Sequence, residues 1–228
     1  MRFISLFVIV LVMISCSRSS STLEKTSSYL ALGDSYTIGE SVPERERFPV
    51  QLSILLNEAG IKTESPKIIA TTGWTTDELA EGIRNEKLNQ EYNLVTLLIG
   101  VNNQYRGRDT AEYRLQFAEL LQTAISFGAK NPKSVIVVSI PDYGVTPFAK
   151  DRNPEKIARE IDIFNQINKE ESEITGTHYV NITPISKQAK TDSTLVAPDG
   201  LHPSGKMYSL WTEEILPVAK QILTNQNK

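Results

Sequence analysis

The segment YLALGDSYTIGE (residues 29–40) decides the fold, because an apolar run of strand length changes within it into small and polar residues. Its first part, YLALG, has the length and composition of a buried strand bounded by a turn signal. Gly33 allows the backbone to turn sharply where that strand ends, and Ser35 follows just beyond the turn. The segment therefore predicts a strand that delivers a serine to one edge of a sheet.

Further apolar runs of strand length follow along the chain, and longer segments with a helical pattern separate them. The runs are KIIATT, NLVTLLIG, SVIVVSI and HYVNI, and helices are expected at about residues 48–60, 75–87, 109–128, 153–175 and 203–225. Strands that are apolar on both faces and alternate with helices are typical of a parallel sheet covered on both sides. The sequence therefore predicts a three-layer α/β/α fold.

The composition favours one globular domain and argues against some kinds of site. The chain has 228 residues, of which 40% are hydrophobic and 22% charged, which suits one globular domain. Its formal net charge is -3, so it lacks the positive charge that attracts nucleic acid. Cys16 is the only cysteine, which rules out an intramolecular disulfide. The expected domain holds two histidines and no cysteine, which makes no convincing metal cluster. No glycine-rich phosphate loop is found in the sequence. We therefore expect no metal and no cofactor.

The first residues have the pattern of a signal peptide. Arg2 precedes the apolar run FISLFVIVLVMI (residues 3–14), which is too short to cross a bilayer, since a spanning helix takes about 20 residues. We therefore expect residues 1–15 to be a signal peptide rather than a membrane span.

The stretch MISC, which ends at Cys16, resembles the lipobox of bacterial lipoproteins, with Met13 in place of the usual leucine. The resemblance implies a lipid anchor on Cys16 and a place in the bacterial cell envelope, facing the periplasm or the exterior. An ordinary secretory signal is the alternative. Residues 16–27 are rich in serine and lack apolar periodicity, so we expect a flexible tether, with the folded domain spanning residues 28–228.

The predicted strands deliver polar and glycine-rich segments to one edge of the sheet. Ligand sites in open α/β sheets lie beyond the carboxyl ends of the strands. There the first strand brings GDSYT with Ser35, the second TTGWT with Gly73, and the third GVNNQYRG with Asn102. A late turn, APDGLHPSG, carries Asp199 and His202. We expect these segments to meet.

The two histidines have different surroundings. His202 lies three residues after Asp199 in a turn, so the carboxylate can hold one ring nitrogen and leave the other free as a base. A serine that meets the free nitrogen becomes a nucleophile. Helix capping by Asp199 or Ser204 is the alternative interpretation of this turn. His178 lies in an apolar run, where we expect a core or strand-end histidine.

Taken together and in this order, the four segments that carry Ser35, Gly73, Asn102 and the pair Asp199 and His202 resemble the motifs of the SGNH hydrolase family, also called GDSL esterases and lipases. The resemblance extends over nearly the whole domain. The resemblance implies a serine ester hydrolase with a catalytic triad of Ser35, Asp199 and His202. It also implies an oxyanion hole formed by Ser35, Gly73 and Asn102.

Two departures from related patterns bear on this prediction. The third motif of the family usually reads Gly-x-Asn-Asp, and Asn103 stands where the family has the aspartate. The Gly-x-Ser-x-Gly elbow of α/β hydrolases is absent, because Thr37 occupies the place of its second glycine. We therefore expect the SGNH hydrolase fold, a flavodoxin-like sheet of five parallel strands in the order 2-1-3-4-5.

The substrate is left open by the sequence. The resemblance covers carboxylesterases, lysophospholipases, thioesterases and carbohydrate deacetylases, and a tethered enzyme would meet lipid or envelope-glycan esters. The alternative function is a surface-anchored protein that binds an anion or a glycan without chemistry, because backbone amides at a strand-to-helix turn bind anions. Binding alone gives no reason for Asp199, His202 and Asn102 to accompany the serine.

Four further residues carry weaker expectations. Trp74 and Tyr105 follow the second and third strands, so either side chain can line a substrate pocket, and packing is an equal expectation for Trp74. Arg106 follows Tyr105 on the same loop and can contact the leaving group or the acyl chain, with a solvated loop residue as the favoured expectation. Asp142 follows the fourth strand and is expected to cap the next turn.

Overall fold

The computed structural model describes residues 26–88 and 90–226. The expected signal peptide and most of the expected tether lie outside the described residues. Ser27, which the sequence assigned to the tether, pairs with Thr63 and donates its amide to the carbonyl of Lys62 at 2.8 Å. Ser27 is therefore part of the folded domain, which begins just before the first strand.

The sheet has five parallel strands in the order β2-β1-β3-β4-β5, which confirms the expected topology. The strands are β1 (Tyr29–Gly33), β2 (Lys67–Ala70), β3 (Leu94–Leu98), β4 (Val135–Val138) and β5 (His178–Val180). Gly33, the last residue of β1, pairs with Ala70 on one side and Leu98 on the other. The carboxyl ends of β1, β2 and β3 therefore lie at one edge, beside the place where the strand order reverses.

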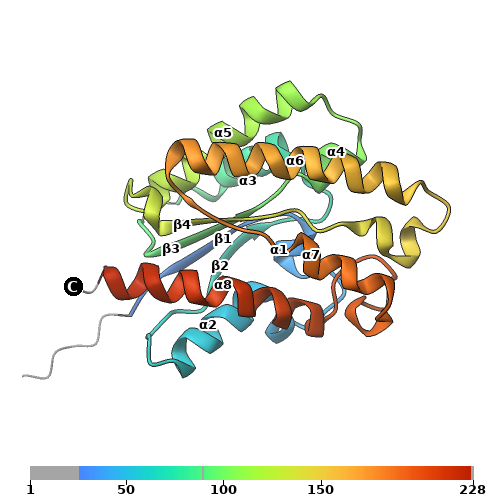
Figure 1. Ribbon diagram of the computed structural model, residues 1–228. Coiled ribbons are helices and arrows are strands. Elements are labelled where there is room, and N and C mark those ends of the chain that lie inside the picture. The colour runs from blue at the N-terminus through green and yellow to red at the C-terminus, as the bar shows by residue number, and fades with distance from the viewer. Residues whose placement is uncertain (1–25, 89, 227–228) are drawn as a thin grey trace, which may run out of the picture.

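Helices cover both faces of the sheet (Figure 1). One layer contains α2 (Phe48–Glu58) and α8 (Gly205–Asn225), and the other contains α3 (Thr76–Glu86), α5 (Thr110–Phe127) and α6 (Pro154–Thr175). The short helices are α1 (Ser35–Ile38), α4 (Val101–Tyr105) and α7 (Thr183–Ser186). Short 3-10 turns span Glu44–Glu46, Pro132–Ser134, Tyr143–Val145, Pro147–Ala149, Lys187–Lys190 and Ser193–Leu195. Within the described ranges, no helix has the length and apolar character needed to cross a membrane.

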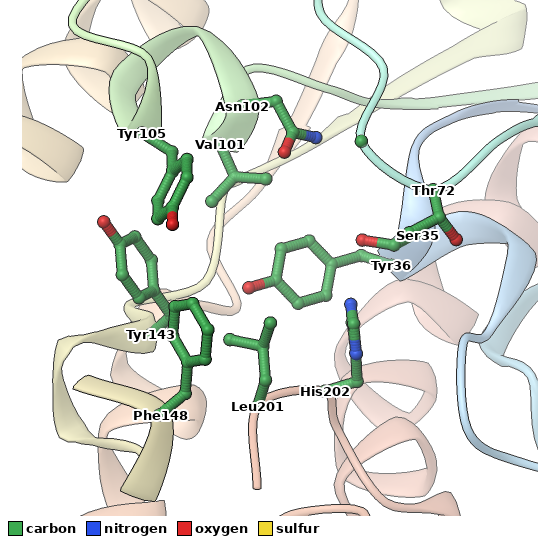
Figure 2. Close-up of a pocket in the computed structure, with 11 residues that line it drawn as sticks. Ser35, Tyr36, Thr72, Val101, Asn102, Tyr105, Tyr143, Phe148, Leu201 and His202 are labelled. Carbon is green, nitrogen blue, oxygen red and sulfur yellow. The ribbon is translucent and has the colours of Figure 1, made fainter. Parts of the chain in front are cut away.

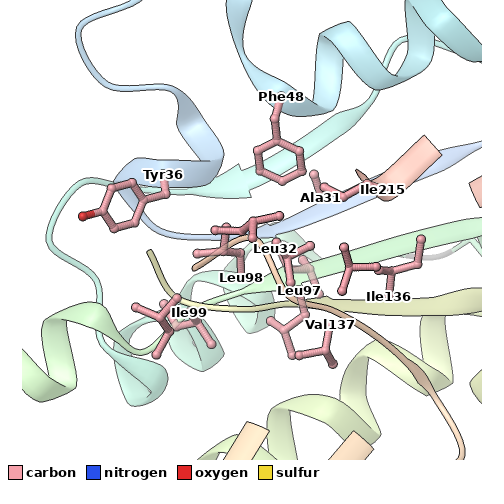
Figure 3. Packing of buried hydrophobic residues seen from close by; sticks show 14 of the residues in the cluster. Ala31, Leu32, Tyr36, Phe48, Leu97, Leu98, Ile99, Ile136, Val137 and Ile215 are labelled. Atoms are coloured by element: carbon pink, nitrogen blue, oxygen red, sulfur yellow. The ribbon is translucent and has the colours of Figure 1, made fainter. Parts of the chain in front are cut away.

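The core lies on both faces of the central strands, as their unbroken apolar sequences predict. Every residue of β1, β3 and β4 is buried. Figure 3 shows Phe48 of α2 and Ile215 of α8 beside Ala31, while Leu97 and Val137 point to the opposite face. Burial of each large apolar side chain contributes about 1.5 to 3 kcal/mol relative to exposure, so the sheet is a firm support for the loops at its edge.

Capping residues explain why the long helices begin close to the expected positions. Asp109 accepts hydrogen bonds from the amides of Ala111 and Glu112 at the start of α5. Thr75 and Glu78 form a capping box at the start of α3. Such caps satisfy amides that have no partner within the helix. Local sequence therefore fixes where α3 and α5 leave the edge that carries the site.

Candidate active site

Ser35 is the first residue of α1, directly beyond the carboxyl end of β1. Asp34 caps this short helix, because its Oδ1 accepts the Tyr36 amide at 3.0 Å. A Cβ at position 33 would collide with the Thr37 hydroxyl and with the carbonyl oxygen of Leu98, so only glycine allows β1 to turn here. The close packing holds Ser35 at the floor of the pocket, where it is 5% exposed.

Asp199 and His202 lie in the loop of residues 196–203, immediately before α8. Asp199 Oδ1 accepts the amides of Leu201 at 2.9 Å and His202 at 3.0 Å, and Asp199 Oδ2 lies 2.6 Å from Nδ1 of His202. The cap of α8 is Ser204, which accepts the Met207 amide at 3.2 Å. The capping interpretation therefore holds for Ser204, whereas Asp199 bonds its own turn and the imidazole.

Hydrogen bonds keep the carboxylate of Asp199 ionised. Burial alone would raise the pKa of Asp199, but hydrogen bonds from Ser41, His202 and two backbone amides outweigh it and hold the pKa well below its usual range. Because the Asp199 carboxylate engages Nδ1 of His202, Nε2 is the ring nitrogen left without a hydrogen bond among the described residues. The edge of the Tyr36 ring packs against His202 at 5.8 Å between centroids and restrains the ring further.

All the sequence-predicted site residues except Asp199 line one cavity of about 210 Å³ (Figure 2). The lining residues are Ser35, Tyr36, Thr72, Gly73, Val101, Asn102, Tyr105, Tyr143, Phe148, Leu201 and His202. Figure 2 shows the Ser35 hydroxyl on the side of the pocket toward which Nε2 of His202 points. Within the described residues, the hydroxyl and the ring are not joined by a hydrogen bond. The structure thus brings both groups to the same pocket, although they come from opposite ends of the chain.

Two loops on the other side of the pocket hold each other in place. Gly73 has a left-handed backbone (φ +87°), which favours glycine, and its carbonyl accepts Nη2 of Arg106 at 2.6 Å. Asn102 donates from Nδ2 to the carbonyl of Trp74 at 2.9 Å. One N–H of the Asn102 amide is thereby used to join the loops, and its second N–H is left for a ligand.

Asn103, which stands where the family usually has aspartate, is buried and bonds Thr76. It is 1% exposed, its Oδ1 accepts the Thr76 amide at 3.1 Å, and its Nδ2 donates to the Thr76 hydroxyl at 2.8 Å. That hydroxyl in turn donates to Gln116 Oε1 at 2.5 Å. An aspartate cannot donate to the hydroxyl, so the amide at position 103 suits this particular arrangement.

The weaker expectations have mixed outcomes. Tyr105 lines the pocket. Trp74 does not line it, because its ring packs where a Cβ on Gly82 would lie. Arg106 is not merely solvated, since it bonds the Gly73 carbonyl and pairs with a glutamate on α3. Asp142 caps the next turn as expected, accepting the amide two residues later at 2.8 Å.

The pocket also contains residues that the sequence analysis did not single out. Tyr36 follows Ser35 directly, while Tyr143 and Phe148 lie on the segment after β4. Leu201 precedes His202 in the loop before α8. Ligand sites in open α/β sheets lie beyond the carboxyl ends of the strands, and the segment after β4 begins at such an end. The sequence could therefore have placed Tyr143 and Phe148 at the pocket.

Two further titratable side chains, His178 and Asp34, do not line the pocket. His178 is the first residue of β5, hence at the opposite edge from the pocket, where burial and the charge of Lys133 lower its pKa. Asp34 is fully buried, its Oδ2 has no hydrogen-bond partner within the described residues, and burial raises its pKa to about 7. No group of three or more potential metal ligands is found in residues 26–88 and 90–226.

The fold and the pocket define a class: three-layer α/β proteins that present a serine and a histidine–aspartate pair at the carboxyl edge of a parallel sheet. A family model described as the GDSL-like Lipase/Acylhydrolase family matches residues 31–210. The match covers most of the chain, so this protein belongs to that family of lipases and acylhydrolases, as the sequence resemblance predicted. A comparison with curated protein sequences found no significant match.

Solved structures share the fold over nearly their whole length. TesA has a TM-score of 0.68 at 18% identity and covers 86% of this chain and 99% of its own. The psychrotrophic esterase EstA from Pseudoalteromonas sp., solved with monoethylphosphonate as inhibitor, has a TM-score of 0.66 at 18% identity. The match covers 87% of this chain and 100% of EstA. A variant of Axe2, an acetyl xylan esterase from Geobacillus stearothermophilus, has a TM-score of 0.63 at 18% identity. The match covers 85% of this chain and 94% of the Axe2 variant. At these identities the likeness shows a common fold.

Proposed function

We propose that the protein is a serine ester hydrolase that works through an acyl-enzyme on Ser35. The observation that carries the proposal is the 2.6 Å contact between Asp199 Oδ2 and His202 Nδ1 beside the pocket that contains Ser35. The family and the named activities of its structural neighbours, two of them esterases, support the same chemistry.

Acylation begins when the Ser35 oxygen attacks the ester carbonyl carbon. Nε2 of His202 takes the hydroxyl proton as the new C–O bond forms, and Asp199 stabilises the imidazolium that results. The same proton then passes to the oxygen of the leaving alcohol as the original ester bond breaks. Water repeats the sequence on the acyl-enzyme, which releases the acid and restores the free serine.

The oxyanion that forms during both steps needs hydrogen-bond donors. The proposed donors are the backbone amides of Ser35 and Gly73 and the second N–H of Asn102. Donors already fixed by the protein stabilise a developing charge without reorganisation, and the loss of one costs about 3 to 4 kcal/mol. The bonds from Arg106 and to Trp74 support this role, because they fix the two loops that supply the donors.

The far side of the pocket supports an apolar group on the substrate. Tyr105, Tyr143 and Phe148 pack around one another with ring centroids 6.2 to 6.3 Å apart. The guanidinium of Arg152 covers one face of two of these rings, at 4.7 Å from the centroid of Tyr105 and 5.2 Å from that of Phe148. Such a cluster offers mainly apolar ring surface, with the hydroxyls of Tyr105 and Tyr143 as its polar groups, and the Tyr105 hydroxyl already accepts a hydrogen bond from Arg152 at 2.8 Å.

The size of the pocket narrows the proposed substrate class. Ligand pockets commonly have volumes of about 300 to 1,000 Å³, and this one has about 210 Å³. Val101 and Leu201 add to its apolar lining, and the described lining residues include no carboxylate, lysine or arginine. We therefore propose esters with a short or medium-length apolar group as substrates, in preference to acetylated sugars.

The first experiment compares wild type with Ser35→Ala on p-nitrophenyl butyrate. The variant should lose at least about 1,000-fold in kcat, because no nucleophile remains. Ser126→Ala, an exposed serine on α5, is the matched control and should keep wild-type activity. A wild type that binds ligand but never turns over ester would favour the binding-protein alternative instead.

A second experiment tests the substrate class. Phe148→Ala should lower kcat/KM for the butyrate and hexanoate esters more than for the acetate ester. Leu115→Ala, which removes an exposed side chain on α5, should change none of the three. Faster hydrolysis of acetylated xylooligosaccharides than of simple butyrate esters would contradict the proposed preference.

A further inference from the structure

Ser41 shares an oxygen atom of Asp199 with the proposed catalytic histidine. The Ser41 hydroxyl donates to Asp199 Oδ2 at 2.6 Å, and Nδ1 of His202 lies 2.6 Å from that same oxygen. Ser41 and Asp199 are separated by 158 positions in the sequence. The contact therefore joins the segment that follows the proposed nucleophile to the loop that carries the proposed base.

The backbone of Ser41 is held in an uncommon conformation. Its φ of +65° is left-handed, which for a residue other than glycine costs about 1 to 2 kcal/mol. Ser41 is exposed, so no packing of its own side chain accounts for the conformation. The hydrogen bond to Asp199 is the observed interaction that this conformation makes possible.

The neighbouring residue makes a similar contact in another direction. Glu40 accepts a hydrogen bond from the hydroxyl of Thr72, which precedes Gly73. Consecutive residues after α1 thus contact the loop of the proposed oxyanion hole and the loop of the proposed base. The segment of residues 39–41 links both loops to the helix that begins with Ser35.

Asp199 needs such a contact because its own turn fixes only half of the carboxylate. Two backbone amides hold Oδ1, whereas Oδ2 has Ser41 and His202 as its partners. The Asp199 side chain is 29% exposed, so water can compete for Oδ2. Without the Ser41 hydroxyl, Oδ2 keeps only His202 as its partner, so water can take the place of the serine and the orientation of the imidazole is less firmly fixed.

We infer that Ser41 is a positioning residue, which holds Asp199 Oδ2 against His202 Nδ1 and so keeps the imidazole aimed at Ser35. The inference rests on the proposed esterase function, since it concerns the orientation of the proposed base. Ser41 itself is not among the residues that line the pocket of Ser35.

The test uses variants that separate the backbone from the hydroxyl. Ser41→Gly relieves the left-handed conformation and removes the donor, so it should keep or raise the thermal midpoint while kcat falls about tenfold, the size expected for a bond to a charged group. Ser41→Asn tolerates the same conformation and supplies an N–H donor, so it should recover most of the lost kcat. KM should change little in both variants. Wild-type kcat in Ser41→Gly would overturn the inference.

A second readout does not depend on activity. The Nδ1 proton of a histidine bonded to a carboxylate gives a far-downfield proton resonance, and His178→Gln identifies the signal of His202, because the chain has only two histidines. The resonance should weaken or shift in Ser41→Gly and return in Ser41→Asn. An unchanged resonance in Ser41→Gly would overturn the inference even if the enzyme is active. Inactive wild type with a Ser41-dependent resonance would instead refute the esterase function alone.

Discussion

The side-chain amide of Asn102 donates a hydrogen bond to the main-chain carbonyl of Trp74, at 2.9 Å between Nδ2 and the oxygen. The bond connects the loop after β3 to the loop after β2, and both loops line the pocket. It also sets the plane of the amide, so that the second N–H has a fixed direction. The proposed oxyanion hole therefore depends on a contact made outside it.

Replacing Asn102 should affect the chemical step more than substrate binding. Asn102→Ala should lower kcat about 100- to 1,000-fold with little change in KM, because the lost donor stabilises charge that is present only in the transition state. Asn102→Asp has the same size without the N–H donors and should lose at least as much. Steady-state kinetics on p-nitrophenyl butyrate measures both, and near-normal kcat in either variant would remove Asn102 from the oxyanion hole.

Arg106 should influence activity through Gly73 rather than through substrate charge. Its guanidinium bonds the Gly73 carbonyl at 2.6 Å and pairs with Glu78 at 3.0 Å, in a half-exposed position. Arg106→Ala should lower kcat by about tenfold, which is less than the roughly 100-fold loss that a 1 Å displacement of a catalytic group can cause. Stability should change little, because exposed ion pairs contribute little to it. The neighbouring Arg108→Ala is the control for charge. Equal effects of the two changes would contradict a specific role for Arg106.

The rate should rise with pH as the imidazole of His202 loses its proton, since only the neutral ring accepts a proton from serine. Asp199 does not supply this limb, because hydrogen bonds outweigh burial and hold its pKa well below its usual range. Tyr36 does not supply it either, since burial raises its pKa far above neutrality. A kcat/KM profile from about pH 5 to 8 measures the limb, and a flat profile would count against His202 as base.

Asp34 directly precedes Ser35 and its pKa is raised toward neutrality, so Asp34→Asn is the necessary comparison. Burial raises the pKa of Asp34 to about 7. The variant keeps an acceptor for the Tyr36 amide and should retain the acid limb of the rate profile. Loss of the limb in Asp34→Asn would assign it to Asp34 instead.

The stability of the protein should also depend on Asp34. Because its folded pKa lies above the unfolded value, its contribution is fully present below about pH 4 and is lost as the pH rises toward 7. Relative to Asp34→Asn, wild type should lose about 2 to 3 kcal/mol of unfolding free energy between pH 5 and pH 8. Urea unfolding at the two pH values measures the difference, and parallel losses in both proteins would show that Asp34 does not titrate as expected.

Much of the fold was predictable because its signals are local. The apolar run before Gly33 and the alternation of strand and helix patterns specify a parallel sheet, and Asp109 and Thr75 cap the helices near the expected positions. The close spacing of Asp199 and His202 likewise predicted their contact, because a single turn brings them together. These features need no knowledge of distant parts of the chain.

The supporting contacts of the site were not predictable in this way. Ser41 meets Asp199 across 158 positions, and a serine gives no sign in the sequence that its backbone is left-handed. Arg106 looks like any exposed arginine until the path of two loops places Gly73 beside it. Tertiary structure decides such contacts, whereas periodicity and spacing report only on local structure.

Covalent labelling shows whether Ser35 is a nucleophile that His202 activates. Wild type and His202→Ala are each incubated with an activated alkylphosphonate ester, digested, and examined by mass spectrometry. We expect one adduct on Ser35 in wild type and almost none in folded His202→Ala. An adduct on another residue, or equal labelling of Ser35 in both proteins, would contradict this expectation.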